Sequence, residues 1–242
     1  MSKAFGHGDR RLRPWLAAAD NDVDLVAGIE GGKSKVREFA FTVKEPPAVR
    51  TLDLGGLTVP EHLLARYQPD GSDAQVMLVW AETAAGTVNI YRRLYPAGDP
   101  GVGGERVLLL KRPGPLLAME MLPVGGESVD LLFGAVGTSG KYSYLRIPLA
   151  GGKPSIERSF DVPAGNADGW AIAALREDGC AVLAKAGERL IWSRIEPGEG
   201  WNIIASGSGQ ARYMRLFDLG DRRLWAVWYD PQSGIRYQPL PR

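Results

Sequence analysis

Short runs of alternating apolar and polar residues follow one another along almost the whole chain. Residues 39–43 read Phe-Ala-Phe-Thr-Val, and residues 142–147 read Tyr-Ser-Tyr-Leu-Arg-Ile. Alternation with a period of two puts successive side chains on opposite faces of a strand, so each run predicts a half-buried β-strand. The 31 glycines and 17 prolines are spread between these runs. They predict tight turns and mark no linker or domain boundary.

Five glycines reveal a repeat in this pattern. Gly32, Gly86, Gly140, Gly187 and Gly234 each lie in a short polar turn between two strand-like runs, and they follow one another at intervals of about fifty residues. A unit of this length built only from strands and turns cannot cover both faces of its own small sheet, so it must pack against its neighbours. The repeat therefore predicts a β-propeller whose blades are four-stranded antiparallel sheets.

The strand-like runs fall into five such blades. We place them at residues 14–54, 62–111, 116–162, 170–205 and 212–240 of the 242-residue chain. The last blade has three runs, and a ring with a missing strand would expose unpaired backbone groups. We therefore expect residues 2–8 to pair with the last blade and close the ring. The predicted fold class is all-β, a single five-bladed β-propeller domain over residues 1–242.

The blade pattern is clearest at residues 175–184, which read Leu-Arg-Glu-Asp-Gly-Cys-Ala-Val-Leu-Ala. With such blades the whole chain resembles the five-bladed β-propellers, and the blades are loosely WD40-like or TolB-like. The resemblance implies a ring that presents loops on two flat faces. The blades differ from one another, so identical sugar sites repeated around the ring are not expected.

Charge and composition narrow the choice of partner and compartment. The chain has 29 Lys and Arg residues against 28 Asp and Glu residues. This balance gives no overall field to attract a polyanion, so no nucleic-acid partner is expected. No apolar run of about twenty residues predicts a membrane span, and no signal peptide is evident. The single cysteine, Cys180, forms no internal disulfide. We expect a cytoplasmic protein, with the periplasm as the alternative.

Residues 27–34, Ala-Gly-Ile-Glu-Gly-Gly-Lys-Ser, match a permissive phosphate-loop pattern. A working phosphate loop needs a helix directly after its Lys-Ser pair, because the helix N-terminus holds the phosphates. Residues 39–43 alternate as in a strand instead. A hairpin turn is therefore the preferred interpretation, and a nucleotide site at Lys33 is the alternative. The glycine-rich residues 101–104 and 207–209 are interpreted as flexible loops, so no cofactor is expected.

Metal and nucleophilic chemistry have few candidate residues. His7 and His62 are the only histidines, and a lone cysteine does not complete a zinc site with them. The aspartates within residues 20–24 do not match the spacing of an EF-hand loop. Cys180 lies in an apolar run, where a buried and inert thiol is expected. The sequence therefore predicts no metal site and no catalytic residue.

A sugar-active propeller, either carbohydrate-binding or glycoside-hydrolysing, is the alternative from a different functional class. Hydrolysis needs two carboxyl groups about 5 to 10 Å apart. The acids expected on or near inner strands are Asp20, Glu61, Glu120, Asp168 and Asp218. Aromatic faces can stack on sugar rings, and the tryptophans that begin strands are Trp15, Trp170 and Trp201. Trp80, Trp192, Trp225 and Trp228 lie within strands and are expected to pack between blades.

The main functional prediction is a non-catalytic interaction module, an accessory or scaffolding subunit that docks onto a larger protein assembly and is not an enzyme. A protein partner is therefore expected, with a small-molecule or sugar ligand as the alternative. The residues expected to gather on the binding face are His62, Asn166, Asp168, Arg212, Lys33, Glu82, Lys141, Glu188 and Asp230. A basic docking patch is expected at Arg10, Arg11 and Arg13.

Overall fold

The structure is a computed structural model of the chain. It describes residues 13–16, 23–40, 48–56, 58–70, 73–96, 101, 103–121, 127–134, 141–163, 167, 169–175, 179–196, 200–207, 211–218 and 224–240. Only the backbone is described for residues 13–16, 23–30, 38–40, 48, 67–70, 73–74, 174 and 218. The chain divides into two compact units, Met1–Arg112 and Pro113–Arg242, and each is described by itself.

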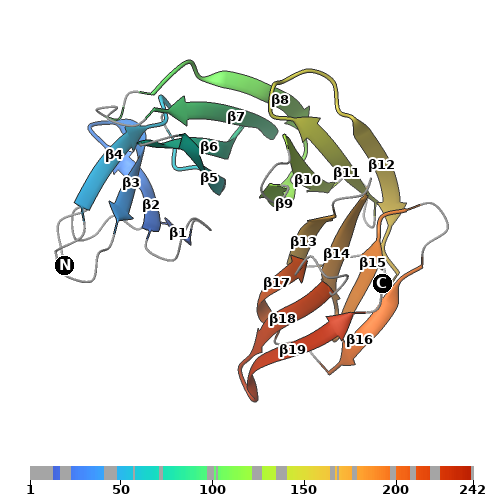
Figure 1. The fold of residues 1–242 in the computed structure, drawn as a ribbon. Helices are drawn as coiled ribbons and strands as arrows, with labels where there is room; N and C mark the ends of the chain where they lie inside the picture. Colours follow the sequence, from blue (N-terminus) through green and yellow to red (C-terminus); the bar gives the residue numbers. More distant parts are fainter. Residues whose placement is uncertain are drawn as a thin grey trace. The chain divides into compact units, whose positions relative to one another are not determined.

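The first unit contains two four-stranded sheets (Figure 1). The first sheet consists of β1 (Arg13–Leu16), β2 (Val23–Glu30), β3 (Lys33–Ala40) and β4 (Ala48–Asp53). The second sheet consists of β5 (His62–Asp70), β6 (Asp73–Ala84), β7 (Thr87–Tyr95) and β8 (Val107–Pro113), which ends one residue past the unit boundary. In both sheets the strands lie in chain order, as in a meander.

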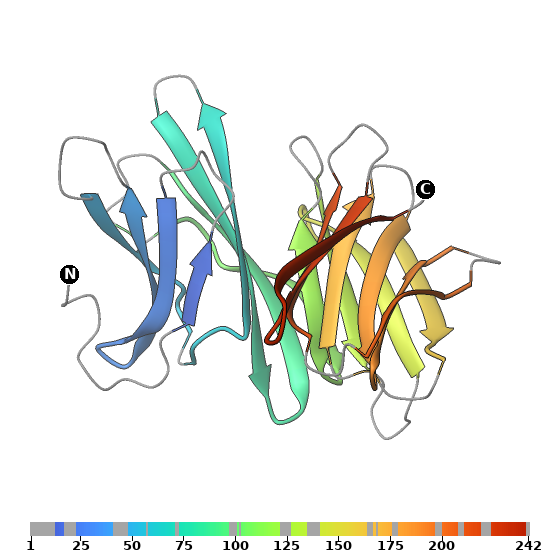
Figure 2. The same ribbon diagram turned by 90° about the horizontal axis from the view of Figure 1, so that it is seen from below.

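The second unit contains three more meanders (Figures 1 and 2). The third sheet consists of β9 (Leu116–Met121), β10 (Ser128–Gly134), β11 (Lys141–Pro148) and β12 (Ile156–Asp161). The fourth sheet consists of β13 (Gly169–Leu175), β14 (Gly179–Ala186), β15 (Arg189–Arg194) and β16 (Asn202–Ser206). The fifth sheet consists of β17 (Arg212–Asp218), β18 (Leu224–Asp230) and β19 (Gly234–Leu240).

These sheets confirm the predicted all-β architecture built from antiparallel propeller-type blades. The described strands form five antiparallel sheets, and the last sheet has three strands among the described residues. Three of the five repeat glycines, Gly32, Gly86 and Gly187, lie in the turns that join β2 to β3, β6 to β7 and β14 to β15. A fourth, Gly234, begins β19 directly after the turn from β18, and all four have positive φ. The fifth, Gly140, lies outside the described residues.

The phosphate-loop-like segment is a hairpin. Gly31 and Gly32 form the turn between β2 and β3, and Glu30 pairs with Lys33 across it. The residues after Ser34 continue β3, where a nucleotide site would require a helix. The alternative of a phosphate site at Lys33 is therefore excluded.

The third, fourth and fifth sheets pack face to face in the way that propeller blades stack. Their first strands are neighbours, because β13 contacts both β9 and β17. One apolar cluster between the fourth and fifth sheets includes Leu183, Trp192 and Trp228, all buried. Another, between the third and fourth sheets, includes Tyr144 and Val182. Each sheet thus buries a face that it cannot cover alone, as the repeat predicted.

The first and second sheets share a core of the same kind. Trp80 of β6 and Tyr95 of β7 are fully buried against Val36 and Leu52 of the first sheet. The glycine-rich segment after β7 contributes to this packing. A Cβ atom on Gly101 would lie 1.8 Å from the carbonyl oxygen of Thr51, so close backbone approach, more than flexibility, explains this glycine.

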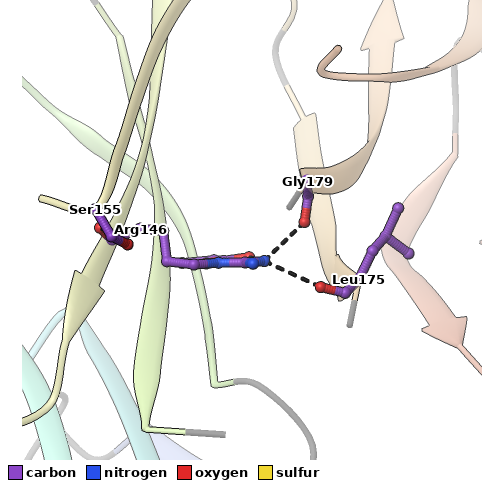
Figure 3. A network of polar contacts seen from close by, with 5 residues as sticks. Arg146, Ser155, Leu175 and Gly179 are labelled. Atoms are coloured by element: carbon purple, nitrogen blue, oxygen red, sulfur yellow. Dashed lines mark hydrogen bonds and ion pairs between the residues drawn. The ribbon is translucent and has the colours of Figure 1, made fainter. Parts of the chain in front are cut away.

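A buried arginine joins the third and fourth sheets (Figure 3). Arg146 of β11 forms a bidentate ion pair with Asp130 of β10, with donor–acceptor distances of 2.8 and 2.9 Å. The same guanidinium donates to the carbonyl oxygens of Gly179 at 2.7 Å and Leu175 at 3.2 Å in the fourth sheet. These contacts satisfy the charge of Arg146 and fix the two sheets against each other.

Candidate functional site

Most of the predicted binding residues lie at strand ends. His62, Lys33, Lys141 and Arg212 begin β5, β3, β11 and β17, and Asp230 ends β18. Glu188 is in the turn between β14 and β15, and Glu82 is inside β6. Within its own sheet, each lies at or near the end where the first strand begins. Asn166 and Asp168 lie outside the described residues, so a shared binding face stays a prediction.

Glu82 has an interaction within the first unit that the sequence did not predict. Arg106 donates to one carboxylate oxygen at 2.7 Å, and the indole N–H of Trp80 donates to the other at 2.9 Å. The guanidinium of Arg106 also lies over the Tyr91 ring, 3.6 Å from its centroid. Glu82 therefore orders the packing of the second sheet.

The predicted basic patch falls largely outside the described part of the chain. Arg10 and Arg11 precede it, and Arg13 is the first residue of β1, with only its backbone described. A docking role for these residues stays a prediction.

A candidate pocket lies between the third and fourth sheets. It has a volume of about 520 Å³, which is within the usual range for small-molecule sites. Its walls are strand β12, the end of β15 and the segment that leads into β16. The lining residues are Arg158, Ser159, Phe160, Asp161, Ser193, Arg194, Ile195, Glu196 and Trp201. We call it the β12–β15 pocket.

Trp201 and Phe160 give the β12–β15 pocket an aromatic wall. The two ring centroids are 6.1 Å apart, and both residues are half-buried. The indole N–H of Trp201 donates to the backbone carbonyl of Asp161 at 3.0 Å, which fixes the ring across the two sheets. Phe160 in turn stacks on Tyr142, and Tyr142 contacts Trp170 at 4.5 Å. The wall is thus supported by a packed row of aromatic side chains.

Arg158 supplies hydrogen-bond donors beside this wall. It shares one face of β12 with Phe160, because every second side chain points the same way. Its guanidinium donates to the carbonyl oxygen of Ile195. An arginine carries five N–H donors, so others remain to serve a ligand.

Glu196 supplies acceptors on the opposite wall. It directly follows Ile195 and is exposed, and no hydrogen bond or ion pair of its carboxylate is found among the described residues. The hydroxyl of Ser193 bonds the carbonyl oxygens of Arg194 and Gly200 and so holds both ends of the intervening segment. Donors, acceptors and an aromatic face therefore meet in one pocket.

The acids considered for hydrolysis are only partly described. Asp20 and Asp168 lie outside the described residues, and only the backbone of Asp218 is described. Glu61 precedes β5 and accepts a hydrogen bond from the Thr83 hydroxyl at 2.8 Å. Glu120 lies on β9, and the pKa of its carboxyl group is raised to about 7. Removal of the carboxyl group from water is the main cause, Arg215 opposes the shift and Asp130 adds to it.

Other candidate chemistry is weakly represented. Cys180 is fully buried, as expected, and burial raises the pKa of its thiol. No group of three or more His, Cys, Asp or Glu side chains is placed to hold a metal ion within the described ranges. The same ranges contain no helix of the length and apolarity that a membrane span requires.

Sequence reasoning identified only part of the β12–β15 pocket. Trp201 was singled out because it begins a strand, and it proves half-buried in the pocket wall. Arg158, Phe160 and Glu196 were missed. The available signal for Arg158 and Phe160 was the alternation of residues 156–161, which puts both on the same face.

Comparisons with known proteins show similarity at the level of fold. No protein-family model matches the chain, and no curated protein matches its sequence. Among solved structures it is similar to a mutant Aleuria aurantia lectin in complex with Fucα1-6GlcNAc, at 12% identity and a TM-score of 0.49, covering 95% of this chain and 78% of the lectin.

Two glycoside hydrolases are similar in the same way. A GH43_1 enzyme from Xanthomonas citri has 12% identity and a TM-score of 0.41, with 95% of this chain and 90% of the enzyme covered. The RS223 β-xylosidase has 8% identity and a TM-score of 0.40, with 95% and 91% covered. At identities this low, the similarity concerns the fold alone.

These comparisons correct two expectations. The similar propellers are a lectin and glycoside hydrolases, so the resemblance to WD40-like or TolB-like blades is not supported. The prediction of a non-catalytic scaffolding subunit for a protein assembly is contradicted by the same finding.

Proposed function

We propose that the protein binds carbohydrate in the β12–β15 pocket. The observation that carries the proposal is the meeting of three features in one cavity of about 520 Å³. These are the aromatic wall of Trp201 and Phe160, the donor Arg158 and the acceptor Glu196. A sugar ring has an apolar C–H face and a rim of hydroxyl groups, and this combination matches it.

Hydrogen-bond chemistry supports a ligand rich in hydroxyl groups. A hydroxyl both donates and accepts, whereas an arginine only donates and a carboxylate only accepts. Neighbouring hydroxyls of one sugar can therefore bond Arg158 and Glu196 together. The lining also carries two arginines and two acidic residues, so its formal charge is balanced, and this favours a neutral ligand.

Titration calorimetry with purified protein tests the proposal. The lectin and xylosidase comparisons suggest a panel that starts with fucose and xylose, followed by a glycan array. Trp201→Ala removes the stacking face and should weaken binding about tenfold or more. Glu196→Gln removes an exposed acceptor charge and should weaken binding severalfold without loss of folding.

Trp225→Ala is the matched control, because Trp225 lies on β18 outside the pocket lining. Binding unaffected by both pocket variants, or no binding to any glycan, would overturn the proposal. Aryl glycosides are assayed in the same preparation. Turnover that Glu196→Gln abolishes would replace binding by hydrolysis as the function of this pocket.

We also propose that the five sheets form one ring in a single domain over residues 1–242, closed by residues 2–8 along β19. Support comes from the neighbouring first strands β9, β13 and β17, which is how blades meet around a propeller axis. Further support is that β19 ends a sheet with three strands among the described residues, where the other sheets have four. A paired edge would protect the backbone groups of β19.

A further inference from the structure

The segment of residues 195–201, which joins β15 to β16, carries two residues that line the β12–β15 pocket. Glu196 lies near its start and Trp201 at its end. Residues 196–201 read Glu-Pro-Gly-Glu-Gly-Trp, and two glycines in so short a stretch leave the free chain many conformations. The positions of the Glu196 carboxylate and the Trp201 ring therefore depend on how the two ends of this segment are held.

Backbone pairing with β14 holds the start of the 195–201 segment. The N–H of Ile195 donates to the carbonyl oxygen of Cys180 at 3.0 Å, one step beyond the last described pair of the β14–β15 ladder. The end of the segment lies outside any such ladder among the described residues, because the β15–β16 ladder starts at the pair of Trp192 and Asn202. Side chains must therefore hold the end that carries Trp201.

Ser193 provides this support from β15. Its hydroxyl lies 3.0 Å from the carbonyl oxygen of Gly200 and 2.9 Å from that of Arg194, and it donates its single proton to this pair. The residue is 2% exposed, and a buried hydroxyl is costly unless it is hydrogen-bonded. Serine is also not among the residues that strands favour. The hydrogen bond, and not packing, therefore explains a serine at this position.

Trp201 is consequently held at its backbone and at its ring. Ser193 fixes the backbone directly before it through Gly200, and the indole N–H of Trp201 donates to the carbonyl oxygen of Asp161 at 3.0 Å. Ser193 thus acts on the aromatic wall from β15, while Asp161 acts on it from β12. Without the hydroxyl of Ser193, the indole bond would have to hold the end of the segment alone.

We propose that Ser193 is a positioning residue of the β12–β15 pocket, because its hydroxyl holds the 195–201 segment in the conformation that presents Trp201 to a ligand. A pocket that is ordered before binding loses less conformational entropy when a ligand enters, so Ser193 raises affinity through Trp201. The effect on sugar affinity rests on the proposed function. The effect on the order of Trp201 does not, and it can be measured without a ligand.

The ligand-free test is the NMR order parameter of the Trp201 indole N–H, assigned by its absence in Trp201→Phe. In the wild type it should be about 0.85, as in a rigid backbone, and in Ser193→Ala it should fall below about 0.6. The indole of Trp192, buried in the same sheet, is the internal control and should stay rigid. Ser143→Ala removes a serine of β11 outside the pocket lining and should leave both indoles unchanged.

Titration calorimetry with fucose and xylose tests the effect on affinity. Ser193→Ala should weaken binding of the sugar that the wild type binds about three- to tenfold, because the segment then has to be ordered on binding. In a Trp201→Ala background the same change should weaken binding less than about twofold, since the ring that Ser193 positions is absent. The Tm of Ser193→Ala should fall by about 2–4 °C. A merely structural role would give the same loss of affinity in both backgrounds.

Two results would overturn the inference. The first is an order parameter of Trp201 that is already low in the wild type or that Ser193→Ala leaves unchanged. The second is a loss of affinity in Ser193→Ala that is equally large in the Trp201→Ala background. If no glycan binds the wild type, the proposed function fails, and the order parameters of Trp201 alone then support or overturn the positioning role of Ser193.

Discussion

Glu120 is an exposed residue whose carboxyl group has a raised pKa. Its position on β9 leaves the residue as a whole exposed, while protein atoms around the carboxyl group raise the pKa to about 7. In the unfolded chain a glutamate titrates near its ordinary value of 4.5. Between these two pH values the folded protein holds more protons than the unfolded chain.

This difference predicts how stability depends on pH. Because the folded state binds more protons, the contribution of Glu120 to the free energy of unfolding falls as pH rises from about 4.5 to about 7. Glu120→Gln removes this titration. The stability of the variant should therefore rise relative to that of the wild type as pH increases over this range. Solvent screens an exposed group, so we expect a gain in Tm of about 2 °C by pH 8.

Thermal unfolding of both proteins at several pH values from 4.5 to 8 measures the gain. Glu61→Gln, at an exposed acid that precedes β5, is the matched control and should show no comparable trend. A constant difference between Glu120→Gln and the wild type across this range would contradict the prediction.

Single residues differ in how far the sequence reveals their role. Trp201 and Trp170 were recognised because large aromatics that begin strands are often only partly covered, and both are half-buried. Arg158 and Glu196 were not, because their proximity arises only when two sheets pack together. Tyr213 adopts a left-handed backbone conformation, with a φ of 51°. No sequence signal predicted it, because glycine or asparagine is the usual residue in this conformation.

At the scale of elements, Arg146 links two sheets through a buried charge. Its side chain is 7% exposed and the Asp130 side chain 0%. Burial raises the pKa of Asp130, and the hydrogen bonds and charge of Arg146 lower it. Two backbone carbonyls of the fourth sheet complete the arrangement (Figure 3). Removing one partner would leave a buried charge without compensation.

Arg146→Met should therefore lower the free energy of unfolding by about 3–5 kcal/mol. The double variant Asp130→Asn, Arg146→Met should lose less, because no unpaired carboxylate remains. Urea unfolding measures both. Arg189→Met, at an exposed arginine of β15, is the control and should change little. A loss in Arg146→Met as small as in Arg189→Met would show that the link carries no stability.

The strands themselves were predictable because alternation and turn glycines are local signals. Trp80, Trp192, Trp225 and Trp228 were expected to pack between blades. Trp80, Trp192 and Trp228 are buried in clusters between sheets. Trp225 is instead half-buried and contacts Tyr237 of its own sheet. The contact of Arg146 with the fourth sheet was not predictable, because alternation shows on which face of a strand a side chain lies but not which residue it contacts.

At the scale of the whole molecule, the outer edge of the fifth sheet, strand β19, decides whether the sheets can close into one ring. β19 pairs with β18 on one side, and its residues Ile235 and Tyr237 are 73% and 70% exposed. An exposed edge strand with apolar side chains tends to pair with another chain. Closure by residues 2–8 would give this edge its partner within the same molecule.

Deletion of residues 2–8 should therefore have two effects. Loss of several ladder hydrogen bonds, each worth about 1 kcal/mol, should lower the Tm by roughly 5–10 °C. The uncovered edge should also cause self-association that increases with protein concentration, which light scattering detects. Replacing residues 2–8 by a Gly-Ser segment of equal length is the matched control for chain length, and it should be similarly destabilised.

A charge placed on the edge separates the two effects. Tyr237→Lys in the truncated chain should suppress self-association, because a lysine on an edge strand opposes pairing between chains. The same substitution should not restore the Tm, since the lost hydrogen bonds are not replaced. A truncated protein that stays monomeric with the Tm of the full chain would mean that residues 2–8 do not complete the fifth sheet, and the closed ring would need another partner for β19.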